Sequence, residues 1–203
     1  ERSIPWDSPL YRQGLAQFRG NLDRLLRRYR SAGVPVLVGT LASNERDQPP
    51  FVSTVGGEDS AASHYGRART LDAAGRYEAA RAEYVAARDR DELRFRAPTA
   101  FNATIREVAP VAGAVVVEVE RAFVAASRDG IVGADLMLEH VHPNVDGYFV
   151  LATAFVPALT AQLGVPQVAI DDATVRREIP VTEIDRLAGE YRLQVLRNDW
   201  PFV

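Results

Sequence analysis

Helical and strand-like spacings of hydrophobic residues alternate along the first 120 residues of the chain. Over residues 9–31, apolar side chains recur at intervals of three and four, which predicts a helix with one apolar stripe. Residues 34–41 follow as a short continuous apolar run, which is typical of a strand buried on both faces of a parallel sheet. A helix that leads into such a strand is half of a βαβ unit. The apolar stripe of the helix comprises Leu15, Phe18, Leu22, Leu25, Leu26 and Tyr29.

The same order of elements comes a second time after residue 97. Pro98 and Thr99 begin a predicted helix that ends before Gly113, and residues 114–119 form a second, Val-rich run. This repeated alternation favours the α/β class, with helices packed on a parallel sheet. Further along, the pattern predicts an apolar helix over 149–163, a short helix from Thr182 to Leu187 and a weak strand over 191–196.

Residues 61–92 differ from both flanks because they are rich in Ala, Arg, Glu and Tyr and carry no strand signal. Their spacing resembles one tetratricopeptide unit, a helical hairpin with small residues where its helices cross. The matching positions are Gly75, Tyr77, Ala80, Tyr84 and Ala87. A solenoid needs about three or more repeats to bury its core, and this sequence contains one. We therefore expect the hairpin at 61–92 to be inserted into a domain formed by 1–60 and 93–203, and a protein partner could bind it.

The amino-acid composition of the chain excludes several classes of function. The chain has 203 residues with 24 basic and 27 acidic side chains, a net charge of −3 that argues against a nucleic-acid-coating protein. All basic residues are Arg, so lysine chemistry within the chain is excluded. Cysteine is absent, which excludes disulfides, cysteine-based zinc sites and thiol catalysis. No apolar run reaches the roughly 18 residues that a membrane span needs. Localisation stays open.

Arginines crowd the predicted helix at 9–31, four of them at Arg24, Arg27, Arg28 and Arg30. They could form an anion-binding patch. They could equally be a solvated face with cations placed favourably near the C-terminus of the helix.

Polar segments at two loops carry the candidate chemistry. Asn44 lies in the loop 42–50 after the first predicted strand, at the edge where α/β sheets bind ligands, so it is a candidate substrate-binding residue. Glu139 and His142 lie in a second loop, three residues apart. A carboxylate that orients an imidazole and stabilises its cation is the basic arrangement of general-base catalysis. His140 and His142 could instead bind a metal, although further ligands are not evident, or could be structural.

The segment Glu139-His-Val-His142-Pro-Asn-x-x-Gly147 resembles the last signature block of the SGNH, or GDSL-type, hydrolases, which reads Asp-x-x-His. Further pieces are similar to one bacterial branch with a helical insertion, so the resemblance covers nearly the whole chain. These pieces are Phe18-x-x-Asn21-Leu22, Ser43-Asn44-x-x-Asp47-x-x-Pro50-Phe51, Arg94 to Pro98 followed by Asn102, and Asn198 to Phe202. The resemblance implies a flavodoxin-like three-layer fold with a parallel sheet of about five strands. It also implies hydrolysis or transfer of an acyl group from a small-molecule or carbohydrate ester, without a cofactor or metal.

In that scheme His142 is the general base and Glu139 orients it, in place of the usual Asp. The Gly-Asp-Ser block that carries the family's nucleophile is absent, and Ser60 does not replace it because no buried strand precedes it. Two strands are also too few for such a sheet. We therefore expect a segment before Glu1 to supply about three strands, the serine and the oxyanion donors, and the chain alone to be inactive. The alternatives are a non-catalytic interaction module with a degenerate hydrolase scaffold and a metal-dependent hydrolase that uses His140 and His142.

Overall fold

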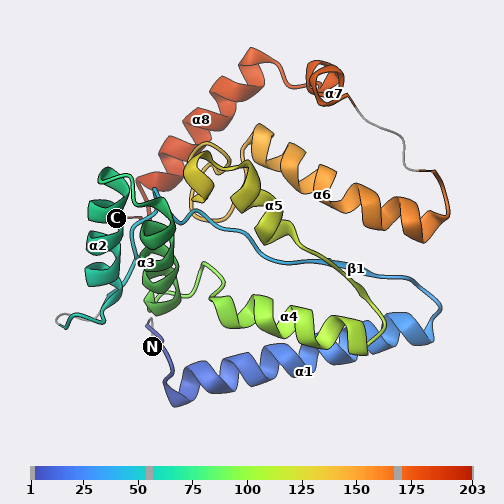
Figure 1. Ribbon diagram of the computed structural model, residues 1–203, viewed down its shortest axis with the longest axis horizontal. Coiled ribbons are helices and arrows are strands. Elements are labelled where there is room, and N and C mark those ends of the chain that lie inside the picture. The colour runs from blue at the N-terminus through green and yellow to red at the C-terminus, as the bar shows by residue number, and fades with distance from the viewer. Residues whose placement is uncertain (1–2, 54–56, 167–170, 203) are drawn as a thin grey trace. The chain divides into compact units, whose positions relative to one another are not determined.

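The protein is described by a computed structural model that covers residues 3–53, 57–166 and 171–202. The expectation about a segment before Glu1 therefore lies outside the described residues. The chain divides into two compact units, 1–165 and 166–203, and the predicted hairpin lies inside the first. The described residues form eight α-helices, one short 3-10 helix and two short strands (Figure 1).

Helix α1 spans Pro9–Ser31, as its apolar spacing predicts. Ser8 caps the first turn, because its hydroxyl oxygen accepts a hydrogen bond from the backbone N–H of Tyr11 at 3.2 Å. Gly33 follows the helix with a φ of 70°, a left-handed conformation that glycine adopts without steric cost. Local signals at both ends therefore determine where this helix begins and ends.

The predicted apolar stripe of α1 is wrong in part. Leu26 is buried, whereas 51% of Leu25 and 44% of Tyr29 are exposed. Leu26 packs into a cluster with Ala109, Ala112 and Ala114, next to the two-stranded sheet that the described residues form. Leu25 consequently lies outside the core.

The sheet consists of β1 (Leu37–Gly39) and β2 (Val115–Val117), which pair in parallel with Leu37 opposite Val115. The parallel pairing of the two predicted strands is thus confirmed. Beyond β1, the side-chain amide of Asn102 takes the place of a further neighbour. It accepts a hydrogen bond from the N–H of Leu41 at 2.7 Å and donates one to the carbonyl of Leu41 at 2.9 Å.

Helices cover both faces of this small sheet (Figure 1). On one face, α1 and α4 (Thr99–Val111) pack against Val36, Val38 and Val116. On the other face, α5 (Val119–Ala126) and α6 (Val145–Leu163) pack against Leu37 and Val117. No described helix is long and apolar enough to cross a membrane.

The expected flavodoxin-like three-layer α/β sheet is wrong. The described residues form a mostly helical structure in which the only sheet has two strands of three residues each. The two Val-rich runs do pair, but every other long apolar segment of the described chain has helical spacing and forms a helix. A two-stranded sheet between helices does not make the fold an α/β sheet fold of the expected kind.

The second unit contains α7 (Asp172–Glu178) and α8 (Glu183–Arg197), neither of which has a buried residue. The predicted cap at Thr182 is confirmed: Thr182 and Asp185 form a reciprocal capping box. The strand expected over 191–196 is wrong, because α8 continues through it. The apolar residues of α8 recur at helical intervals, at Ile184, Leu187, Tyr191 and Val195.

Two helices, α2 (Ala61–Ala73) and α3 (Tyr77–Arg90), form the predicted hairpin. Ala68 and Ala80 are fully buried in one cluster, which shows the small residues at the crossing that the sequence predicts. Tyr84 lies in the same cluster and is 2% exposed. That the hairpin is an insertion in a separate domain stays a prediction.

Buried ion pairs attach the hairpin and the segment after it to the loop 42–50. Arg88 of α3 contacts Glu45 at 3.2 Å, and both side chains are at most 2% exposed. Arg46 contacts Asp72 of α2 at 2.9 Å, next to the 3-10 helix η1 (Arg128–Gly130). Burial is the largest effect on Glu45 and raises the pKa of its carboxyl, while Arg88 and Arg81 oppose that rise.

Removal of one partner from this buried pair is expected to destabilise the fold. An Arg88→Leu substitution leaves Glu45 with weaker compensation, and the loss in unfolding free energy should be about 3 kcal/mol. The measurement is urea unfolding at neutral pH. The matched control is Arg28→Leu on exposed α1, which should change stability by less than about 0.5 kcal/mol. Equal effects of the two substitutions would contradict the importance of the pair.

Candidate functional site

The loop that carries Glu139 and His142 lies between η1 and α6 and is closed on itself. The N–H of Leu138 donates to the carbonyl of His142 at 2.8 Å, and the N–H of Asn144 donates to the carbonyl of Leu136 at 2.9 Å. Met137 is 2% exposed and anchors the loop in the main hydrophobic cluster. The loop is therefore a compact unit that is tied to the core.

Glu139 occupies the centre of this loop. Its side chain is 2% exposed, and its carboxylate accepts hydrogen bonds from the backbone N–H groups of His140 at 2.8 Å and His142 at 2.6 Å. The N–H of Val141 points to the same carboxylate at 3.4 Å. Both neighbouring imidazoles also contact it through Nδ1. A buried carboxylate is stable only when such donors compensate for the lost water.

The donors also determine the charge state of Glu139. Burial by itself raises the pKa of the carboxyl, but the contacts from His140 and His142 outweigh it and lower the pKa to about 2. Glu139 is therefore ionised at any pH at which the protein is expected to work. An ionised carboxylate only accepts hydrogen bonds, so it favours the tautomer of His142 that has its proton on Nδ1.

The imidazole ring of His142 is held in place by Glu139 and is also accessible to solvent. Its Nδ1 lies 2.5 Å from Oε1 of Glu139, while 65% of the side chain is exposed. Within the described part of the chain, the ring hydrogen-bonds to Glu139 alone. Its other nitrogen, Nε2, consequently faces solvent with a free lone pair when the proton is on Nδ1. This arrangement is what a general base requires.

His140 has a different environment from His142. It is 8% exposed and lies edge-on between the rings of Phe51 and Phe95, with ring centroids 5.2 and 5.6 Å away. Its enclosure by aromatic rings indicates a structural residue that closes the loop against the segments 51–53 and 91–96. In the described ranges, no three His, Cys, Asp or Glu side chains are grouped so that they could hold a metal ion.

The structure brings the predicted residue Asn44 next to this loop through its backbone. The N–H of Asn44 donates to the carbonyl of His140 at 3.0 Å. Its side chain is turned to local structure, because Oδ1 accepts a hydrogen bond from the N–H of Asp47 at 2.8 Å. A role for Asn44 in substrate binding stays a prediction.

The serines of the chain are not arranged as a nucleophile for His142. Ser60 caps α2, since its hydroxyl oxygen accepts from the N–H of Ser63 at 3.2 Å. Ser43 is buried beside Asn44, and its hydroxyl has no hydrogen-bond partner in the described residues. The chain thus presents a carboxylate and a partly exposed imidazole, and no described hydroxyl hydrogen-bonds to that imidazole.

Comparison with known proteins identifies no relative of this chain. No known protein family matches the chain, and neither a curated protein nor a solved structure shows significant similarity to it. The resemblance to SGNH hydrolases is therefore wrong on two grounds: no match supports it, and the mostly helical fold lacks the sheet that the family implies. The α/β sheet fold and the membership of that hydrolase family, which followed from the resemblance, are wrong with it.

Sequence reasoning missed the residues that surround His140. Phe51 and Phe95 lie more than 40 positions away from it. Both belong to segments that the sequence analysis names, but nothing in those segments connects them to His140. One sequence signal could have indicated these contacts: Phe51 and Phe95 are aromatic residues in loops that are otherwise polar, outside any predicted helix or strand.

The close approach of α6 to the loop gives a prediction about Gly147. A Cβ at this position would lie 2.1 Å from the carbonyl oxygen of Leu136 and 2.8 Å from Cβ of Pro143. Gly147→Ala should therefore displace the loop and destabilise the protein by about 2 kcal/mol. Gly14→Ala in α1 is the control, because no atom lies within 4 Å of its Cβ position, and it should be neutral or stabilising. Thermal unfolding measures both, and equal effects would contradict the tight contact.

The low pKa of Glu139 predicts a pH-dependent contribution to stability. The pKa falls from 4.5 for an ordinary glutamate to about 2 in the fold. The carboxylate thus stabilises the protein fully above pH 4.5, and this stabilisation is lost as the pH falls from 4.5 towards 2. Glu139→Gln should cost up to about 3 kcal/mol at pH 7, and the difference from the wild type should shrink below pH 4. Urea unfolding between pH 7 and pH 3 tests this, and a difference that is constant with pH would refute it.

Proposed function

We propose that Glu139 and His142 form a general-base dyad that activates a hydroxyl or water nucleophile for hydrolysis or transfer of an acyl group. The observation that carries the proposal is the asymmetry of His142, whose Nδ1 is held by a buried carboxylate at 2.5 Å while most of the ring is exposed. A base needs this combination: a fixed tautomer and an accessible lone pair.

With a small ester as substrate, the proposed reaction begins with proton transfer to His142. Nε2 of His142 takes the proton of the attacking hydroxyl while its oxygen attacks the carbonyl carbon. The imidazolium that forms is stabilised by the ionised Glu139, which does not itself take up a proton because its pKa is about 2. His142 then returns the proton to the leaving alcohol when the bond from carbon to the alkoxy oxygen breaks. The nucleophilic hydroxyl and the donors for the oxyanion come from outside the described residues.

Hydrolysis of p-nitrophenyl acetate by the full product of the gene that encodes this chain tests the proposal. His142→Ala should lower kcat by about 100-fold or more. Glu139→Gln should lower kcat too, since the amide no longer stabilises the imidazolium. Tyr148→Ala, an exposed neighbour on α6, is the control and should leave the rate unchanged.

Full activity of a folded His142→Ala protein would overturn the dyad. Absence of any esterase activity in the full gene product, together with no labelling by a serine-directed probe, would favour a non-catalytic interaction module instead. For that alternative, Tyr77 of the hairpin is 40% exposed and could contact a partner, whereas Tyr84 is buried.

A further inference from the structure

The outer edge of β1 presents unpaired backbone groups. In the parallel register, β1 bonds to β2 through residues on alternate positions: the carbonyl of Val36 accepts from Val115, and the N–H of Thr40 donates to Val117. The N–H and C=O groups of Leu37 and Gly39 therefore point away from β2. Within the described residues they have no partner, and no residue of β1 is fully buried.

Helix α1 carries three arginines that have no acidic partner among the described residues: Arg24, Arg28 and Arg30. Arg24 bonds only to the side-chain oxygen of Asn21, and no described acidic side chain pairs with Arg28. By contrast, Arg27 contacts Asp23 at 2.9 Å and Arg19 is paired with Glu107. The side chain of Arg30 lies against Gly113, so Arg24 and Arg28 are the unpaired cations of α1 that remain available to a ligand in this region.

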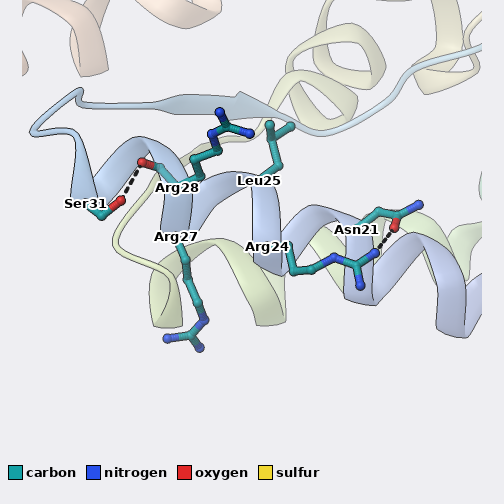
Figure 2. Close-up of a pocket in the computed structure, with 6 residues that line it drawn as sticks. All are labelled: Asn21, Arg24, Leu25, Arg27, Arg28 and Ser31. Atoms are coloured by element: carbon teal, nitrogen blue, oxygen red, sulfur yellow. Dashed lines mark hydrogen bonds between the residues drawn. The ribbon is translucent and has the colours of Figure 1, made fainter.

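These arginines line a shallow hollow on α1 with a volume of about 840 Å³, together with Asn21, Leu25, Arg27 and Ser31 (Figure 2). Figure 2 shows the side chains of Leu25 and Arg28 rising on the side where β1 runs, while Arg27 points the opposite way. Leu26 of α1 belongs to the cluster against which Val36 and Val38 pack, so α1 covers the face of the sheet that these two residues form. Leu25 and Arg28 thus lie on the side of α1 where β1 runs, near the open strand edge.

We infer that this edge binds an extended acidic polypeptide segment as a third β-strand. Its backbone pairs with Leu37 and Gly39, and its carboxylates meet Arg24 and Arg28. The spacing agrees: four helical residues rise about 6 Å, and two strand residues rise about 6.6 Å. The expected partner sequence thus has acidic residues at two alternate positions, with apolar or β-branched residues between them.

Leu25 supports the same geometry. It is 51% exposed and stands between the two arginines in the hollow, so it offers an apolar contact to the added strand. Main-chain pairing supplies affinity in such complexes, and side chains at alternate positions supply specificity. An anion that bound the arginines alone would leave the groups of Leu37 and Gly39 unpaired.

The test uses the 203-residue chain and the synthetic peptide Val-Thr-Glu-Val-Glu-Val-Thr-Val. Binding is followed by NMR, through the amide signals of Leu37 and Gly39 and their exchange with deuterium. The peptide should bind saturably, shift both signals and protect both amides from exchange. Replacement of its two Glu by Gln, or the variant Arg24→Gln/Arg28→Gln, should weaken binding by roughly tenfold.

The matched control is Arg12→Gln/Arg19→Gln, which removes the same charge from the same helix but from cations that pair with Asp7 and Glu107 and do not line the hollow. It should bind the peptide like the wild type. No binding at several millimolar peptide would overturn the inference. So would binding that depends on Arg24 and Arg28 but leaves the amides of Leu37 and Gly39 unprotected, since that result means anion binding by α1 alone.

Discussion

A buried guanidinium group must donate hydrogen bonds to carboxylates or carbonyls, because it no longer bonds to water. This requirement determines how the loop 42–50 packs in the first unit of the protein. Arg96 is 2% exposed, and its donors meet the carboxylate of Asp91 at 3.1 Å and the carbonyls of Asn44 and Gln48 at 3.0 and 2.8 Å. Burial is the main influence on Arg96 and lowers its pKa, while Asp91 opposes the change. The loop 42–50 is therefore shaped around arginines that come from the hairpin and from the segment after it.

The loop 42–50 also connects these buried arginines to the loop that carries Glu139 and His142. On one side it receives Arg88 and Arg96, and on the other it bonds to the histidine loop through Asn44 and His140. The loop that carries Glu139 and His142 is thus bonded to a segment that buried ion pairs hold in place. The low pKa of Glu139, about 2, arises within the loop itself, from the contacts of His140 and His142 with the carboxylate. Arginine suits the buried ion pairs, because its planar fork can meet several acceptors at once.

Hydrophobic spacing predicted α1, and the cap at Thr182 predicted the start of α8. The residues at the ends of α1, Ser8 and Pro9 at its start and Gly33 after it, agree with the bounds that the structure shows. Helix α5 was missed because it follows β2 after a single residue, without a turn residue between them. The extent of the sheet could not be read from the chain either. A Val-rich run predicts that a strand is buried, but the number of its neighbours is decided by contacts far along the sequence.

The site divides in the same way. The spacing of Glu139 and His142 is local, and the structure brings their side chains together. The difference between His140 and His142 is not local, because it arises from Phe51 and Phe95, which enclose one ring and leave the other exposed. Motif resemblance also misled at the level of the fold. A block of a few residues around one loop specifies how that loop closes, and carries little information about the sheet behind it.

The amide of Asn102 has a consequence for the growth of the sheet. It offers Leu41 one donor and one acceptor, which is what a peptide unit of a neighbouring strand offers. A side chain of α4 thereby imitates backbone and terminates the ladder at its carboxyl end. The open stretch of β1 is limited to the two residues before that point, Leu37 and Gly39. Helix α4 therefore determines how many residues of an added strand can pair with β1, and in which register they pair.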